Sequence, residues 1–156
     1  MEIFEADVSD SEYVVDSLWR PMMSEMEDLS KLNKLKGGEV REEAFKYFSD
    51  RLNSDRHEVF IAEVNDSPAG FIAFEKKSGQ SFFERGLYIH VHEVFVVEEH
   101  RRKGIASELL EHAEEFCRDK NYEMIQLSVN VKNHAAQQLY DEHGYDRERL
   151  KMIKEL

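Results

Sequence analysis

A strand–helix–strand succession between residues 87 and 131 constrains the fold more than any other feature of this sequence. The run "LYIHVHEVFVV" (residues 87–97) has strand composition, and "GIASELLEHAEEFCRDK" (residues 104–120) places apolar residues at helical spacing. The run "YEMIQLSVNV" (residues 122–131) then returns to the alternation of a strand. A helix of this length between two strands acts as a crossover, so we expect these two strands to be parallel neighbours.

The segments before this crossover predict antiparallel strands. Residues 58–64, "EVFIAEV", and residues 71–77, "FIAFEKK", flank the turn-forming residues "NDSPAG" and predict a hairpin. A short opening strand, "MEIFEA", is expected at the beginning of the chain. The strands before the crossover should therefore form an antiparallel meander.

Helices are expected on both sides of these strands. Three helical segments are predicted before residue 53: one capped by Ser9, Asp10 or Ser11, one running from Pro21 to about Leu35, and one over residues 41–52. After the crossover, "NHAAQQLYDEHGY" predicts a short helix that ends at Gly144, and "DRERLKMIKEL" (residues 146–156) predicts a last strand. The expected fold class is α/β (α+β), a mixed and mostly antiparallel sheet flanked by helices.

Length and charge limit the kinds of protein that this chain can be. The 156 residues are enough for one domain with its own core, so we expect a single domain over residues 1–156. The net charge of −12 should repel nucleic acid and anionic membrane, so neither is an expected partner. No segment has the length of a membrane span or the pattern of a signal peptide, so we expect a cytoplasmic location. The single cysteine, Cys117, lies in a helical pattern and is expected to pack in the core.

A cationic turn, "HRRKGIA" (residues 100–106), joins the expected strand at residues 87–97 to the crossover helix. Cations at the start of a helix oppose the helix dipole, which adds about half a positive charge there. The free N–H groups of a first helical turn suit a phosphate, and Gly104 allows a ligand to approach the backbone closely. The turn therefore predicts an anion site. A P-loop and a dinucleotide fingerprint are both absent from the sequence.

Two motifs in this part of the chain carry a family resemblance. "RRKGIA" (residues 101–106) resembles the [QR]-x-x-G-x-[GA] element of the GNAT superfamily of N-acetyltransferases. "NHAAQQLYDEHGY" (residues 133–145) is similar to that family's N-x-x-A-x-x-L-Y-x-x-x-G-[FY] element. The resemblance covers residues 60–156 well, whereas residues 1–53 match only in general layout.

The resemblance implies a V-splayed sheet whose fourth and fifth strands part to admit acetyl-CoA, the expected cosubstrate. Residues 1–53 would then be a helical substrate-side region, and residues 58–156 the sheet and acetyl-CoA-binding core. The strand before the turn would pair with the pantetheine arm, backbone amides of the turn would hold the pyrophosphate, and an asparagine would contact the cofactor arm. The implied cofactor-binding residues are Val94, Phe95, Val96, Arg101, Arg102, Lys103, Gly104, Ile105, Ala106 and Asn133.

The resemblance also implies the catalytic residues. Tyr140 is the family's usual general acid, and Glu93, on the strand just before the cofactor-pairing residues, is the candidate general base or amine-binding carboxylate. Strand alternation alone sends Glu93 either into the cleft or out to solvent. The implied reaction is acetyl transfer from acetyl-CoA, by direct attack, to a primary amine of a small molecule, peptide or protein. Homodimers are common in the family.

Histidines offer alternative bases and raise the question of a metal. His90 and His92 are fallback bases, with His92 expected on the face opposite to Glu93. A His-x-His pair can bind metal, but no further ligands stand at convincing spacing, so we expect no metal site. The run "HEVFI" at His57 echoes "HEVFV" at His92, a similarity that coincidence between two strands explains.

Two other functions remain open from the sequence. One is a noncatalytic CoA-binding sensor with the same fold. The other is a phosphate- or nucleotide-binding interaction module. Trp19, Tyr47, Phe48, Phe82 and Phe83 are candidates to line an acceptor pocket, although aromatic residues near helix ends are more often packed in a core.

Overall fold

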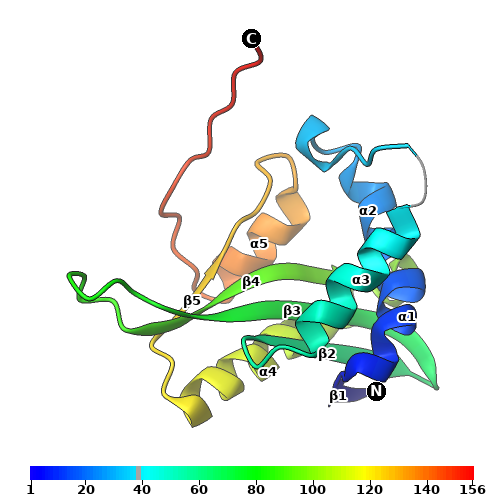
Figure 1. The fold of residues 1–156 in the computed structure, drawn as a ribbon, viewed down its shortest axis with the longest axis horizontal. Coiled ribbons are helices and arrows are strands. Elements are labelled where there is room, and N and C mark those ends of the chain that lie inside the picture. Colours follow the sequence, from blue (N-terminus) through cyan, green and yellow to red (C-terminus); the bar gives the residue numbers. More distant parts are fainter. Residues whose placement is uncertain (38–39) are drawn as a thin grey trace.

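A five-stranded sheet with the order β1-β2-β3-β4-β5 forms the centre of the fold (Figure 1). The structure is a computed structural model, and it describes residues 1–37 and 40–156. Strands β1 to β4 are antiparallel neighbours, and β4 and β5 are parallel, as the crossover predicts. The strands are β1 (Glu2–Glu5), β2 (His57–Val64), β3 (Ser67–Ser78), β4 (Leu87–Val96) and β5 (Met124–Leu127).

The predicted hairpin forms, but its turn is tighter than expected. Asn65 and Asp66 alone connect β2 to β3, and both have positive φ angles, 53° and 60°. Two successive residues with positive φ make the hairpin turn whose twist matches that of the strands, and Asn and Asp tolerate it well. The remaining residues of "NDSPAG" belong to β3, where the register shifts opposite Ala62 and Glu63.

The N-terminal helices cover one face of the sheet (Figure 1). A 3-10 turn (Val8–Asp10), α1 (Ser11–Tyr13), a π-helical segment (Val14–Trp19) and α2 (Arg20–Met26) follow one another without a break. Asp7 caps the 3-10 turn by accepting hydrogen bonds from Ser9, a cap that the sequence analysis did not offer. Asp10, one of the three predicted caps, does stand at the N-cap position of α1, but its side chain makes no cap hydrogen bond to α1 and accepts from the Asp7 N–H instead. The prediction that the second helix reaches Leu35 was wrong, because α2 ends at Met26 and only a 3-10 turn, Lys31–Asn33, follows it.

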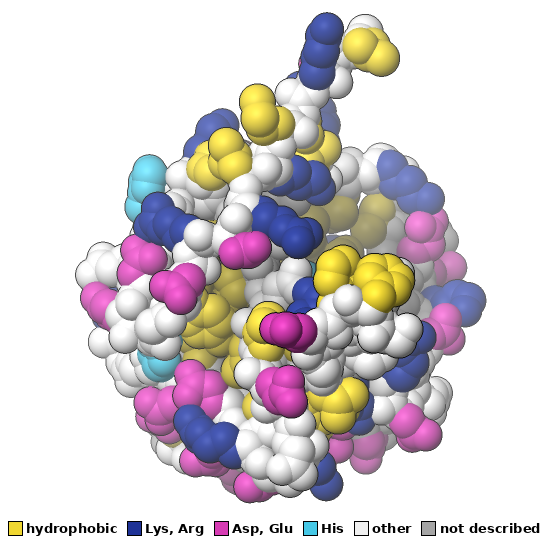
Figure 2. Space-filling model, turned by 90° about the vertical axis from the view of Figure 1, so that its left-hand side faces the viewer, with side chains coloured by type: hydrophobic (Ala, Val, Ile, Leu, Met, Phe, Trp, Pro, Cys, Tyr) yellow, Lys and Arg dark blue, Asp and Glu magenta, His cyan; other side chains and the backbone are white. Residues whose placement is uncertain are grey.

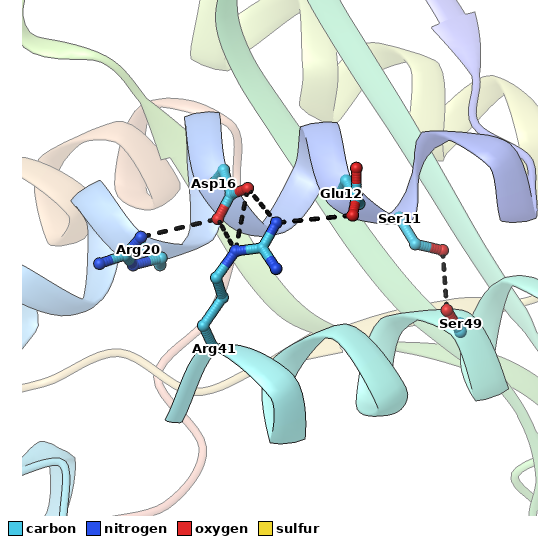
Figure 3. Close-up of polar contacts among 6 residues, drawn as sticks. All are labelled: Ser11, Glu12, Asp16, Arg20, Arg41 and Ser49. Carbon is cyan, nitrogen blue, oxygen red and sulfur yellow. Dashed lines mark hydrogen bonds and ion pairs between the residues drawn. The ribbon is translucent and has the colours of Figure 1, made fainter. Parts of the chain in front are cut away.

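Helix α3 (Val40–Leu52) lies beside the first helices and is tied to them at both ends (Figure 3). Near the beginning of α3, Arg41 places its Nη2 atom 2.6 Å from Oδ2 of Asp16. Near its end, the Ser49 hydroxyl lies 3.1 Å from the Ser11 hydroxyl. Phe48 of α3 is fully buried and packs against Phe71 of β3. The position of α3 matters for the site, because Tyr47 and Arg51 belong to it.

The sheet separates two apolar clusters. Phe48, Ile61, Phe71 and Phe95 belong to the cluster under the N-terminal helices. The other face packs against α4 (Ile105–Lys120), which contributes Ile105, Leu109, Leu110, Ala113 and Cys117. Cys117 is buried, as its helical spacing predicts.

The chain after α4 differs from the prediction in the length of its strands. β5 is only four residues long, Met124–Leu127, and α5 (His134–Glu142) follows it. Gly144 has a φ of 78° just after α5, which confirms it as the helix stop. The prediction of a last strand over residues 146–156 was wrong, since these residues have no regular structure and extend away from the sheet (Figure 1).

The physical reason for this error is the lack of a pairing partner. Charged and apolar side chains alternate only from Arg149 to Met152, and alternation stabilises a strand only when its backbone pairs with a neighbour. The tail is paired with none of the five strands, and Leu150 and Met152 are 72% and 84% exposed. Figure 2 shows this segment projecting from the molecule with both apolar and basic side chains on it.

Strands β4 and β5 part along their length. They pair only from Tyr88 to Val91 on β4, opposite Met124 to Leu127, whereas β4 continues to Val96 beside β3. The later half of β4 therefore has a partner on one edge only, which confirms the V-splayed sheet. Among the described residues, no helix is long and apolar enough to cross a membrane.

Candidate active site

A β-bulge in β4 determines which side chains reach the face of the sheet that the N-terminal helices and α3 cover. Ala73 pairs with Glu93 and Phe74 pairs with Val91, so His92 is an extra residue without a counterpart on β3. The bulge lets two successive side chains share one face: His92 contacts Glu75, and Glu93 contacts Arg51 on α3. The expectation that His92 lies on the opposite face from Glu93 was therefore wrong, because simple alternation does not hold across a bulge.

Glu93 is buried under helix α3. Its side chain is 11% exposed, and its Oε2 atom lies 3.8 Å from Nη1 of Arg51. That separation is too long for a hydrogen bond, and neither buried atom has a hydrogen-bond partner among residues 1–37 and 40–156. Burial raises the pKa of Glu93 to about 7, against the opposing effects of the Arg51 charge and the Tyr47 hydroxyl. A buried carboxylate with an unpaired oxygen and a pKa near neutrality is suited to accept a proton.

Two residues of α3 complete the surroundings of Glu93. The Arg51 guanidinium lies over the Tyr47 ring, 3.8 Å from its centroid. Burial, followed by the negative charge of Glu93, raises the pKa of Tyr47 to about 12, so this phenol stays neutral. The sequence suggested Tyr47 only as an aromatic lining and gave no reason to select Arg51. A signal was available in their i, i+4 spacing, which places both on one face of a helix.

The splayed part of β4 offers free backbone groups. The N–H of Val97 donates to the carbonyl of Ala69 on β3. Because backbone groups of successive residues point to alternate edges, those of Val94 and Val96 point to the open edge and those of Phe95 point to β3. The Val96 carbonyl accepts a hydrogen bond from Nε of Arg101 at 2.9 Å. Within the predicted pantetheine-pairing stretch, the Val94 backbone and the Val96 N–H are thus directed to the open edge.

The turn between β4 and α4 is open and contains two residues with positive φ angles. Arg102 and Gly104 both have positive φ angles, 58° and 83°, on either side of Lys103. Gly104 is the N-cap of α4 and provides no side-chain cap, so the first-turn N–H groups of Ile105 and Ala106 are left without one. The space where a Gly104 Cβ would stand has no heavy atom within 4 Å. Successive N–H groups around an open glycine form a concave site that suits a diphosphate.

The basic side chains of this turn are arranged differently from one another. Nη2 of Arg101 contacts both carboxylate oxygens of Glu25 on α2, at 2.6 and 2.7 Å. Nζ of Lys103 donates to the Glu99 carbonyl at 2.8 Å. Arg101 therefore connects the turn to α2 and to β4, a role that the sequence did not indicate. Its predicted contact with the cofactor stays a prediction.

Helix α5 carries the second predicted motif. Oδ1 of Asn133 accepts from the Ala136 N–H at 3.2 Å and so caps α5, which leaves its amide nitrogen for a ligand. Tyr140 packs against the Tyr145 ring, with the ring centroids 5.6 Å apart. Burial raises the pKa of Tyr140 to about 12. The structure thus places the tyrosine as a neutral hydrogen-bond donor in an apolar setting.

A group of metal-ligating side chains lies beside this site. The potential ligand atoms of His57, Glu75 and His92 are all within 4.8 Å of one another. The sequence did not reveal this group, because its members are 18 and 17 residues apart on three different strands. The echo between "HEVFI" and "HEVFV" was the available signal, since it marks two of the three residues.

Other candidates from the sequence lie elsewhere. Phe48 is in the core, Trp19 packs against it, and Phe82 and Phe83 are 74% and 59% exposed in the β3–β4 connection. An open cavity of about 520 Å³ lies near the last residues of β4, and neither Glu93 nor Tyr140 is among its lining residues. Its lining consists of Ser17, Pro21, Glu25, Ser67, Pro68, Phe95, Val97, Glu98, Glu99 and His100.

A mixed sheet that opens beside a glycine turn at the beginning of a helix defines the class of acyl-CoA N-acyltransferase folds. The model of the acetyltransferase (GNAT) family matches residues 19–145 of this chain. The chain therefore belongs to the GNAT family.

Similar proteins agree with this assignment. An N-alpha-acetyltransferase of Saccharolobus solfataricus is 31% identical over 137 residues, which cover 85% of this chain and 80% of that protein. An uncharacterized N-acetyltransferase of Archaeoglobus fulgidus is 34% identical over 94 residues, or 60% of this chain. The match spans 63% of the length of that relative.

A solved structure supports the fold. A predicted acetyltransferase from Clostridium acetobutylicum, crystallised with acetyl-CoA, superposes with a TM-score of 0.76 at 17% identity. The superposition covers 97% of this chain and 95% of that one.

Proposed function

We propose that this protein is an N-acetyltransferase that transfers an acetyl group from acetyl-CoA to a primary amine by direct attack. The observation that carries the proposal is the unpaired, buried carboxylate oxygen of Glu93 beside the open half of β4. The strand continues from there into the Gly104 turn, so the base and the anion site belong to one continuous segment. Membership of the acetyltransferase family supports the same reaction.

The cofactor end of the site would use mainly backbone groups. The N–H groups around Gly104 would hold the diphosphate, with the Arg102 side chain available to pair with it. The Val94 backbone and the Val96 N–H would pair with the pantetheine amides in the manner of an added strand. Asn133 would donate from its amide nitrogen to the same arm. The open space at Gly104 and the parted strands fit a ligand of this shape.

The chemical end would use Glu93 and Tyr140. Glu93, with a pKa of about 7, would accept the proton of the attacking amine directly or through one water. Tyr140, with a pKa of about 12, is some 3.5 pH units above a thiol near 8.5, so full proton donation would be uphill by about 5 kcal/mol. We therefore assign Tyr140 a hydrogen bond to the departing thiolate. Cys117 is excluded as a nucleophile by its burial, which raises its pKa to about 11.

The acceptor is proposed to be an amine on a small molecule, a peptide or a protein. The Saccharolobus relative is named an N-alpha-acetyltransferase, and an α-amine suits the base of this site. An α-amine has a pKa of about 7.7–8.0, close to that of Glu93, whereas a lysine side chain near 10.4 demands a stronger base.

A screen of amines tests the proposal. The purified protein would be mixed with acetyl-CoA and a panel of peptides with free N-termini, lysine side chains and small amines, and the released thiol would be measured. We expect thiol release that depends on the amine and slows by at least about 100-fold in Glu93→Gln. If acetyl-CoA binds and every amine fails to release thiol, the protein is a CoA sensor. If ATP rather than acetyl-CoA raises the melting temperature, it is a nucleotide-binding module.

A further inference from the structure

We propose that His57, Glu75 and His92 form a binding site for one transition-metal dication, with Zn²⁺ as the best-matched ion. The site lies next to Glu93, on the face of the sheet that the N-terminal helices and α3 cover. It does not depend on the proposed acetyl transfer, because its three ligands are outside the groups that carry that reaction.

The strand register brings the three ligands together. His57 on β2 pairs directly with Glu75 on β3, and Glu75 pairs with His90 on β4. His92 lies two residues after His90 and faces the same side of the sheet by ordinary alternation, and the bulge that follows Val91 adds Glu93 to that face. Nε2 of His92 lies 3.4 Å from Oε2 of Glu75, and the His57 and His92 rings are nearly parallel with centroids 6.4 Å apart. Three adjacent strands hold these side chains, so the site is built on rigid elements.

The spacing of the ligand atoms is close to what Zn²⁺ requires. Zn²⁺ binds His nitrogens at about 2.0–2.1 Å and carboxylate oxygens at about 2.0–2.2 Å, which puts the ligand atoms of a tetrahedral site about 3.3 Å apart. The observed atoms are all within 4.8 Å of one another, so small side-chain rotations close the site. Two histidines and a glutamate leave the fourth position open to water or to a ligand.

One of the three ligands has a coordinating atom that no protein group among the described residues uses. Nδ1 of His57 is buried without a hydrogen-bond partner, an unused nitrogen that a metal ion would engage or orient.

Two cations compete with a metal for Glu75. Nη2 of Arg56 lies 2.8 Å from Oε1, and Nζ of Lys77 lies 3.1 Å from Oε2. The Arg56 side chain is 69% exposed, so breaking its contact with Oε1 of Glu75 costs little free energy. Lys77 shares the oxygen that faces His92, so it is the direct competitor of the metal. Removal of Lys77 should therefore tighten metal binding.

Calorimetric titration of the metal-free protein with zinc sulfate at pH 7.5 tests the proposal. We expect one ion per chain, with affinity lost by at least about 100-fold in His57→Ala and His92→Ala, because even groups behind metal ligands contribute roughly 10- to 100-fold. Lys77→Ala should bind more tightly than the wild type. His134→Ala, which removes an exposed histidine of α5, is the matched control and should bind as the wild type does.

Several outcomes overturn the proposal. They are no heat of binding in the wild type, unchanged affinity in His57→Ala and His92→Ala, or an equal loss in His134→Ala. Circular dichroism checks that each variant is folded. If an alanine variant unfolds, Glu75→Gln keeps the shape of the side chain and removes its charge, and Co²⁺ absorption in the visible range reports its coordination. A Co²⁺ spectrum identical in Glu75→Gln and the wild type excludes the carboxylate as a ligand.

Discussion

The chemistry assigned to this chain depends on a single carboxylate under helix α3. Glu93 is 3.8 Å from Arg51 yet has an oxygen without a hydrogen bond, so its ionised form is only partly compensated. The sequence selected this residue through its place before the cofactor-pairing stretch. It did not predict the direction of the side chain, because that direction depends on a bulge that alternation cannot reveal.

Replacement of Glu93 tests its role directly. In Glu93→Gln we expect kcat/KM to fall by roughly 100- to 10,000-fold, because an amide cannot accept the amine proton. Acetyl-CoA affinity, measured by calorimetry, should stay within about twofold, since Glu93 is outside the turn between β4 and α4 that is proposed to hold the diphosphate. A variant that keeps full activity would exclude Glu93 as the base.

The pH dependence of the reaction should report the same group. The pKa of Glu93 is raised to about 7 by burial, while Arg51 and Tyr47, the groups that face it from α3, act in the opposite direction. The base is active when ionised, so the ratio of wild-type to Glu93→Gln kcat/KM should rise as the pH increases through about 7. Ionisation of the amine substrate affects both enzymes equally, so its effect cancels in this ratio. A ratio that is constant from pH 5.5 to 8.5 would contradict the assignment.

Tyr140 and its neighbour Tyr145 offer a matched pair of variants. Tyr140→Phe should lower kcat by roughly 100-fold, the usual effect of losing one donor to a developing charge, with acetyl-CoA affinity nearly unchanged. Tyr145→Phe removes a hydroxyl that is buried without a partner, so kcat should stay near the wild-type value. Equal kcat values in the two variants would remove the role assigned to Tyr140.

At the scale of elements, the turn between β4 and α4 was predictable from sequence because its chemistry is local. Cations at a helix beginning and a glycine at position 104 are visible in six letters, and the structure gives both Arg102 and Gly104 positive φ angles. The tie from Arg101 to Glu25 was not predictable, since it joins residues 76 positions apart. Contacts of this range depend on how the first helices lie on the sheet.

Gly104→Val tests the turn as an anion site. Valine at a φ of 83° is strained, and its side chain would fill the open space over the helix N-terminus, so acetyl-CoA affinity should fall by more than about 10-fold. Gly144→Val is the matched control, because Gly144 has a φ of 78° and equally open space but lies after α5. Calorimetry with acetyl-CoA distinguishes the two. Equal losses would mean that backbone strain, and not a blocked site, explains the effect.

At the scale of the whole molecule, the order of the strands followed from the sequence. The crossover required parallel neighbours, and the meander before it required antiparallel ones, as the structure has them. The prediction of a last strand over residues 146–156 was wrong, because a sequence pattern alone does not provide a pairing partner. The cluster of His57, Glu75 and His92 was missed for a related reason: three strands must be placed in register before its members meet.

Ligand binding should stabilise the whole fold. A ligand that binds only the native state at 1,000 times its Kd adds about 4 kcal/mol to the free energy of unfolding. For a chain of this size we therefore expect acetyl-CoA to raise the melting temperature by several degrees, as measured by scanning calorimetry. Free acetate at the same concentration is the control. An unchanged melting temperature with acetyl-CoA would contradict the proposed cosubstrate.

The extra residue in β4 has a consequence for how this chain tolerates length changes. Deleting His92 would restore simple pairing between β4 and β3. The strand would then lose the bulge that lets two successive polar side chains, His92 and Glu93, lie on the same face under α3. A shortening that improves the regularity of the sheet would thus remove a polar side chain from the covered face. Insertions and deletions at this point should be far less acceptable to function than to folding.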